Sequence, residues 1–253
     1  MALHQGERNI DQDGIFIDDE HDRQFVADVA QLREDSPEDL MGSDLHQTAI
    51  RVITEGLLQA GPERGLPWHV SSQLMVLMPK ERLGGKNWPP SPDVFVHPTA
   101  GPRPRTSWDV AVEGVPPFVA EVASRSTWDY DAGAKGRGYW YVGVREYLLF
   151  DPTTELLGEE VRARRQTERG MWGPWEPEAD GHWHSSVLGV SFRPQGTLLR
   201  VYDGQGMLLP TVSEQTRRIQ EQERLLAEQA RRADEQARRI AELEAELRRL
   251  RGA

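Results

Sequence analysis

The chain has 253 residues, enough for one or two domains with a substantial core, and its composition limits what those domains can do. It contains no cysteine, which excludes disulfides and thiolate metal sites, and its net charge of -11 argues against a broadly basic nucleic-acid binder. Residues 1–60 hold 14 acidic and 4 basic side chains, whereas residues 61–210 hold 18 and 16 and are close to neutral. Nucleic-acid binding by the middle of the chain is therefore neither indicated nor excluded.

The N-terminal part is acidic and poor in large apolar residues, and we predict that residues 1–22 form a flexible acidic arm. No run of signal-peptide type and no stretch long enough to cross a bilayer is found, so we expect a cytoplasmic protein without membrane contact. A short helix is expected over residues 23–34. A second helix is expected from about Met41, with Ser43 as N-cap, and Gly61-Pro62 should end it.

Two strand regions follow. Residues 67–79 read as one or two strands, and a turn-rich loop leads to a β-branched and aromatic run at 91–96. This run is entered through Pro92 and places the carboxylate of Asp93 at the mouth of a core strand. The proline-rich residues 97–116 are expected to be irregular.

The stretch 117–152 predicts a strand, a crossover helix and a second strand. The apolar run Phe118–Ala123 is typical of a buried strand, and residues 146–150 form another that stops at Asp151-Pro152. The helix between them makes a right-handed parallel unit. Glu121 lies in the middle of the first strand, where a carboxylate is costly unless it is paired, and this points to a site.

Asp93, Glu121 and Lys135 together predict a metal-dependent hydrolytic site. Carboxylates on neighbouring strands can share one hard cation, Mg²⁺ or Mn²⁺, and a nearby lysine can assist a water or offset phosphate charge. Only three of the 30 basic residues are lysine, so chance is a less attractive explanation for a lysine at position 135. The alternative reading of the same residues is a structural ion pair between Glu121 and Lys135 or an arginine.

Several segments, in order, resemble the Uma2 family (DUF820), which is similar to restriction endonucleases of the PD-(D/E)XK superfamily. They are PDVFV at 92–96, FVAEVASRST at 118–127, Lys135 with Tyr139, GVREY at 143–147 and Asp151-Pro152. The resemblance implies an α/β fold with a mixed sheet flanked by helices, a DNA substrate, and Asp93, Glu121 and the Val122 backbone carbonyl as metal ligands.

The resemblance also bears on the auxiliary residues. The superfamily lysine usually stands two residues after the glutamate, where this chain has Ala123, and Lys135 on the following helix takes its place. The family's first helix commonly has a histidine where this chain has His46, which makes that residue an auxiliary candidate; the alternative is a partly buried structural histidine. Ser124 and Tyr139 are further candidates, although Ser124 can simply cap a turn and Tyr139 can simply pack.

The remaining chain reads as an antiparallel β extension over 153–210 and a long helix over 211–253. The tryptophans of the extension more typically cover a small sheet than stack on bases. In the helix, apolar residues recur every seventh position at Val212, Ile219, Leu226, Ala233, Ile240 and Leu247, with glutamine at most d positions. This predicts a coiled coil that pairs with a second chain, giving a homo-oligomer, or folds against the core; a single solvated helix is the alternative.

We therefore predict four segments: an arm at 1–22, a nuclease core at 23–152, a β extension at 153–210 and a coiled-coil helix at 211–253. The leading function is Mg²⁺-dependent hydrolysis of DNA, with Asp93, Glu121 and Lys135 as catalytic residues. The alternative is a catalytically inactive module that binds nucleic acid or protein and oligomerises through the coiled coil.

Overall fold

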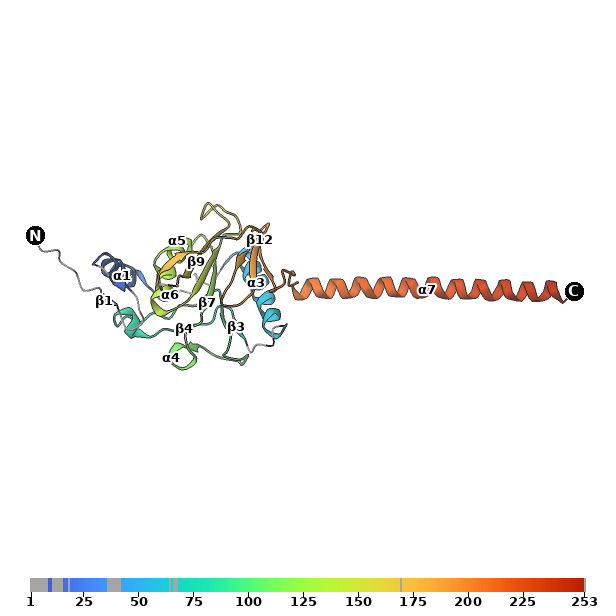
Figure 1. The fold of residues 1–253 in the computed structure, drawn as a ribbon, viewed down its shortest axis with the longest axis horizontal. Helices are drawn as coiled ribbons and strands as arrows, with labels where there is room; N and C mark the ends of the chain where they lie inside the picture. Colours follow the sequence, from blue (N-terminus) through green and yellow to red (C-terminus); the bar gives the residue numbers. More distant parts are fainter. Residues whose placement is uncertain are drawn as a thin grey trace, which may run out of the picture. The chain divides into compact units, whose positions relative to one another are not determined.

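A computed structural model describes residues 9–10, 16–17, 19–35, 42–63, 65, 68–168 and 170–252 (Figure 1). The chain divides into two units, residues 1–209 and residues 210–253. The helical segments are α1 Asp19–Gln31, α3 Asp44–Glu63, η1 Lys80–Leu83, α4 Val110–Glu113, α5 Trp128–Tyr130, η2 Asp131–Lys135, α6 Gly136–Val142 and α7 Val212–Arg251. The strands are β1 Asn9–Ile10, β2 Phe16–Ile17, β3 His69–Ser71, β4 Val76–Leu77, β5 Val94–His97, β6 Trp108–Asp109, β7 Phe118–Val122, β8 Glu146–Phe150, β9 Val161–Gln166, β10 Trp172–Pro174, β11 Trp183–His184, β12 Ser191–Gln195 and β13 Leu198–Tyr202.

The first unit is built on a six-stranded mixed sheet with the order β10-β9-β8-β7-β5-β3. The central strands β7 and β8 are parallel, and every other neighbouring pair in this sheet is antiparallel. The helical segments α5, η2 and α6 form the crossover between β7 and β8. The expected α/β class, with a mixed sheet flanked by helices, a β extension and a C-terminal helix, is confirmed.

Alternating side chains of the central strands supply two cores. Val94, Ala120 and Leu148 face the helix α3 and the small sheet β11-β12-β13. Phe95, Val119, Tyr147 and Leu149 face the crossover helices and the end of α1. Because successive residues of a strand point to opposite faces, the fully buried strand β7 serves both cores. Glu121 lies on the Val119 face, under the crossover helices.

Two glycines allow α6 to lie close to its neighbours. A Cβ atom at Gly136 would lie 2.8 Å from the Asp131 carbonyl oxygen and 3.1 Å from the Tyr147 ring. One at Gly138 would lie 2.7 Å from Leu32. Preceding them, η2 is a π-type turn with a kink at Gly133, a feature often found at functional sites. This close packing brings Lys135 within reach of β7.

Several boundaries differ from those predicted. The first helix begins at Asp19, inside the stretch expected to be an arm, and most of residues 1–18 lie outside the described part of the chain. Helix α3 begins after Ser43 as expected, but it runs two residues beyond Gly61, within the usual scatter of helix ends. Residues 97–116, expected to be irregular, include β6, which pairs in parallel with β4, and the one-turn helix α4.

The predicted boundary at residue 152 is not a break in the structure. Strand β9 pairs with β8 along five residues, and β10 pairs with β9, so both extend the central sheet. Strands β11, β12 and β13 form a separate antiparallel sheet packed on α3. A single sheet can recruit strands from either side of a proline-marked turn, and the sequence does not show which sheet a later strand joins.

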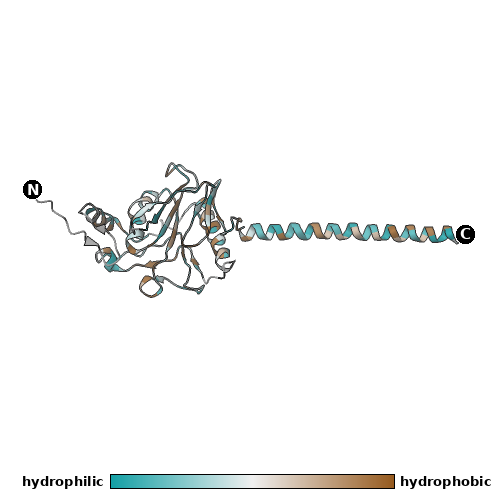
Figure 2. Cartoon of the chain, viewed as in Figure 1, coloured by the Kyte–Doolittle hydropathy of each residue, from teal (hydrophilic) through white to brown (hydrophobic). Residues whose placement is uncertain are grey.

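The second unit is the helix α7, which begins with a capping box. The Thr211 side chain accepts a hydrogen bond from the Glu214 amide, and the Glu214 carboxylate accepts one from the Thr211 amide. None of its described residues is buried, and apolar residues alternate with hydrophilic ones along it (Figure 2). Among the described residues, none of the helices has the length and apolar character needed to span a membrane.

Candidate functional site

Asp93 and Glu121 are joined directly across the start of β5 and the middle of β7. The Asp93 amide donates to Glu121 Oε2 at 3.0 Å, and the Val122 amide donates to Asp93 Oδ2 at 2.9 Å. Asp93 is 6 % exposed and Glu121 is 1 % exposed. The two carboxylates predicted from the sequence are therefore brought together in a buried pair, each fixed by the backbone of the other's strand.

Lys135 reaches this pair from the crossover helix. Its Nζ lies 3.1 Å from Glu121 Oε1, 3.2 Å from Asp35 Oδ2 and 3.2 Å from Asp131 Oδ1. An ammonium group has three donors, and here each of them has a carboxylate oxygen within reach. The expected convergence of Asp93, Glu121 and Lys135 is therefore present in the structure.

Tyr139 also belongs to this site. Its hydroxyl donates to Glu121 Oε1 at 2.7 Å, one helical turn beyond Lys135, and the residue is fully buried. Tyr139 therefore packs in the core, which is one of the two roles predicted from the sequence. Its hydroxyl also holds the Glu121 carboxylate in place.

The cluster carries more negative than positive charge. Four carboxylates, those of Asp35, Asp93, Glu121 and Asp131, face the single ammonium of Lys135. Burial raises the pKa of Glu121 well above its usual value, against the attraction of Lys135, and the neighbouring carboxylates add to the rise. Burial alone would lower the pKa of Lys135, but Glu121 and Asp131 outweigh it and raise that pKa. Lys135 is therefore charged. Within the cluster, Glu121 is the group whose ionised form is least favourable.

His46 lies on the other side of Asp93. Its Nε2 is 3.3 Å from Asp93 Oδ2, and its backbone amide donates to the Ser43 side chain at the start of α3. Burial lowers the pKa of His46, but the neighbouring Asp93 carboxylate outweighs burial and raises that pKa. His46 therefore contacts one of the two carboxylates that the family resemblance names as metal ligands.

A cavity of about 320 Å³ opens beside His46. It lies beyond the carboxyl ends of β7 and β8, where the chain turns at Ser124 and at Asp151. Ser124 hydrogen-bonds Thr127 at 2.9 Å and Ser126 at 3.1 Å, so it organises the turn and does not contact the carboxylate cluster. This cavity is the opening next to the candidate site through which a substrate could approach.

The donor set suits a hard cation that keeps most of its water ligands. Among the described residues, no three histidine, aspartate or glutamate side chains are arranged as a complete metal site. Two carboxylates and one carbonyl are, however, the few protein ligands that Mg²⁺ typically takes. Asp35 Oδ1 is buried without a hydrogen bond among the described residues, and the four carboxylates outnumber the one ammonium group. The residues therefore fit a divalent cation.

The sequence analysis missed Asp35 and Asp131. Asp131 stands four residues before Lys135, and this spacing places opposite charges on one face of a helix. The sequence therefore contained a signal for the pair of Asp131 and Lys135. Asp35 is separated from Lys135 by 100 residues and follows the end of α1, where its side chain accepts a hydrogen bond from the Ser91 amide. No local pattern identifies such a contact.

The chain is similar to known proteins in sequence and in structure. The family model Uma2, described as "Putative restriction endonuclease", matches residues 37–191. A crystal structure described as a putative nuclease belonging to DUF820 from Anabaena variabilis ATCC 29413 is 16% identical, covering 55% of this chain and 72% of that chain with a TM-score of 0.38. No curated protein matches the chain significantly.

Proposed function

The chain belongs to the Uma2 family of restriction-endonuclease-like proteins, and from this we propose that it is a metal-dependent endonuclease that hydrolyses phosphodiester bonds of DNA. One observation carries the proposal beyond the family description. Asp93 and Glu121 meet across β5 and β7, and the Lys135 ammonium lies 3.1 Å from Glu121. A DNA substrate inside the cell also agrees with the expected cytoplasmic location.

Asp93, Glu121 and the Val122 carbonyl would hold the cation, Mg²⁺ or Mn²⁺. When bound, it supplies Lewis-acid polarisation of a phosphoryl oxygen and offsets the charge that develops there. His46, hydrogen-bonded to Asp93, fixes the orientation of that carboxylate.

Lys135 acts first on Glu121. Its charge stabilises the ionised carboxylate against burial, which otherwise raises the pKa of Glu121. To contact a phosphate or water, the ammonium has to release one of its three carboxylate partners. Addition of a divalent cation would weaken the hold of Glu121 on Lys135, because the carboxylate would then share its charge with the cation.

The proposal is tested by incubating supercoiled plasmid with the full-length protein. We expect cleavage with Mg²⁺ or Mn²⁺ and none with EDTA. A wild-type protein that leaves the plasmid intact with either ion would support the inactive binding module instead.

Metal binding can be measured separately from cleavage. By titration calorimetry, we expect Mn²⁺ to bind the wild type and to bind Asp93→Asn at least about tenfold more weakly, because the variant loses a charged oxygen ligand. Glu155→Gln is the matched control, since this exposed carboxylate lines the cavity beside His46 but lies outside the cluster. Equal affinity in wild type and Asp93→Asn would contradict the assignment of Asp93 as a ligand.

We also propose that α7 pairs with a second copy of the chain. Ile219, Leu226 and Ile240 are 55%, 64% and 57% exposed and recur at heptad positions, so an unpaired helix would leave an apolar stripe in water. Several of its charged side chains pair within the helix, for example Arg232 with Glu228 at 2.6 Å.

The apolar stripe of α7 predicts how a charged residue placed within it would change the oligomeric state. We expect the wild type to sediment as a dimer and Leu226→Glu to shift toward monomer, because the substitution buries a carboxylate in the seam. Ala227→Glu, one position off the stripe on the same exposed helix, should stay dimeric. Identical sedimentation of all three proteins as monomers would leave α7 a solvated helix.

A further inference from the structure

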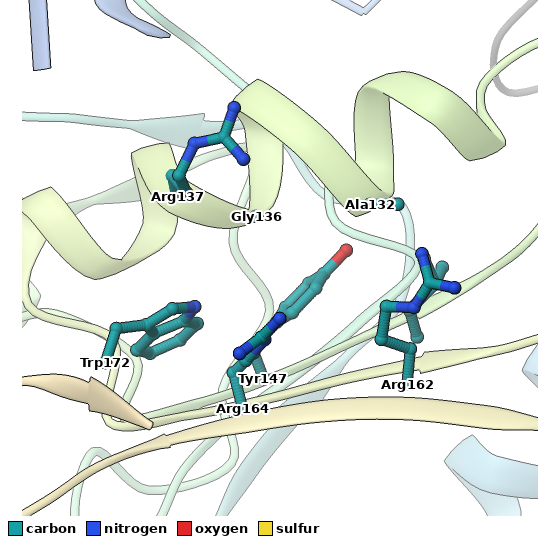
Figure 3. A pocket seen from close by; sticks show the side chains of 8 residues that line it. Ala132, Gly136, Arg137, Tyr147, Arg162, Arg164 and Trp172 are labelled. Atoms are coloured by element: carbon teal, nitrogen blue, oxygen red, sulfur yellow. The ribbon is translucent and has the colours of Figure 1, made fainter. Parts of the chain in front are cut away.

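A second pocket lies on the same face of the sheet as Glu121. It has a volume of about 200 Å³ and lies between the crossover helix and strands β8 and β9 (Figure 3). Three of its lining residues are arginines, Arg137 from α6 and Arg162 and Arg164 from β9. The pocket therefore gathers cationic side chains in a region of the chain that is otherwise close to neutral.

The strand register places this pocket relative to the candidate site. Glu121 pairs with Leu149 on β8, and Leu149 pairs with Arg162 on β9. Directly opposed residues share a face, so Arg162 lies two strands from Glu121, about 10 Å away at the usual strand spacing. Tyr147 and Arg164 form the next row on that face. The pocket therefore opens beside the crossover helices that cover Glu121, about two strand spacings from the candidate site.

The three arginines differ in how they are held. Arg137 is bound to the buried Asp28, with Nε–Oδ2 at 2.6 Å, and Arg162 is bound to Glu159 at 2.7 Å. The guanidinium of Arg164 makes no hydrogen bond or ion pair with any residue in the described part of the chain, and the side chain is exposed. Arg164 is thus the cation with all its donors available, and the other two are fixed in position beside it.

Aromatic rings form another wall of the pocket. Trp172 lies beside Trp140, with ring centroids 6.3 Å apart, and beside Tyr147, with centroids 6.4 Å apart. The Tyr147 hydroxyl donates to the Asp131 carbonyl at 2.9 Å, which fixes this ring against η2. Guanidinium groups bind phosphate oxygens, and an aromatic wall accepts a sugar or base, so the lining matches one nucleotide of a strand.

We infer that this pocket is a phosphate-binding subsite for DNA, in which Arg164 and Arg162 bind a backbone phosphate away from the scissile one. The inference rests on the proposed function for the identity of the strand. The pocket itself requires only a phosphate, which could also be free inorganic phosphate. The aromatic wall and the short distance to the candidate site favour the nucleic acid.

The test measures binding of a short, fluorescently labelled DNA duplex to the full-length protein in EDTA, across a range of salt concentrations. We expect Arg164→Gln to weaken binding about five- to tenfold and to lower the salt slope by about one, because one phosphate contact is lost. Arg165→Gln is the matched control: it is the next residue on β9, is also exposed, and points to the opposite face of the sheet. Its affinity should stay within about twofold of wild type, since it contacts no part of the pocket.

Each outcome decides the inference. Equal losses in Arg164→Gln and Arg165→Gln would indicate only general electrostatic attraction and would overturn it, as would no loss in either. A calorimetric titration with inorganic phosphate alone separates the two sources. Phosphate that binds the wild type as tightly as the duplex does would make this a free-phosphate site and overturn the nucleic-acid assignment, whereas much weaker phosphate binding that is lost in Arg164→Gln supports it.

The same experiments separate this inference from the proposed function. Because EDTA suppresses metal-dependent cleavage, DNA binding is read without any catalytic step. Plasmid cleavage by the wild type together with unaltered DNA binding by Arg164→Gln would contradict the phosphate subsite and support the nuclease activity. Binding that depends on Arg164 in a protein that cleaves nothing would leave the subsite and remove the nuclease.

Discussion

Replacing Glu121 with glutamine is expected to lower DNA cleavage at least about 1,000-fold, equivalent to about 4 kcal/mol of transition-state stabilisation. Glutamine keeps the size of the side chain and an oxygen that can accept from Tyr139, but it removes the charge that a cation requires. The measurement is the initial rate of plasmid nicking with Mg²⁺.

The same variant should be at least as stable as the wild type. Burial and the neighbouring carboxylates disfavour the charge of Glu121 and raise its pKa, so a neutral amide removes a strain that folding otherwise has to overcome. Lys135 loses one partner but retains Asp35 and Asp131. A melting temperature equal to or above that of wild type, with cleavage lost, is the pattern of a residue kept for function at some cost in stability. A large fall in melting temperature would indicate a structural ion pair instead, and unaltered cleavage would end the enzyme assignment.

Replacing Lys135 with methionine is expected to destabilise the protein by roughly 3–5 kcal/mol, the second large effect. The side chain is 4% exposed and its ammonium is the one lysine charge among four buried carboxylates. Methionine fills a similar volume, so the loss of stability reports the missing charge and not a cavity. Urea unfolding followed by circular dichroism gives the free energy of unfolding.

A second substitution tests the cause of that loss. Asp131→Asn removes one of the carboxylates that Lys135 neutralises, so the Lys135→Met/Asp131→Asn protein should recover part of the stability lost in the single variant. Lys86→Met is the control lysine, because its Nζ hydrogen-bonds the Ala30 carbonyl and forms no ion pair with any described residue, and it should change stability by less than about 1 kcal/mol. Additive effects of Lys135→Met and Asp131→Asn would contradict the charge explanation.

The sequence allowed a catalytic role or a structural ion pair for Lys135, and these two interpretations do not exclude each other. The structure contains the ion pair between Glu121 and Lys135 that was the structural alternative, and it also contains Asp93 at the same point. A structural pair alone would not need three further carboxylates around one lysine. This excess of carboxylates supports the cation site that we propose.

From the amino-acid sequence alone we could predict the strands at Asp93 and Glu121, the crossover helix with Lys135, and the extent of α7, because each depends on local hydrophobic periodicity and on turn residues. The three-dimensional fold was needed to show that Asp35 contacts Lys135, that β9 and β10 join the central sheet, and that Arg162 and Arg164 lie on the face of Glu121. Those contacts join residues far apart in the chain, and they depend on strand order and register, which no local pattern specifies.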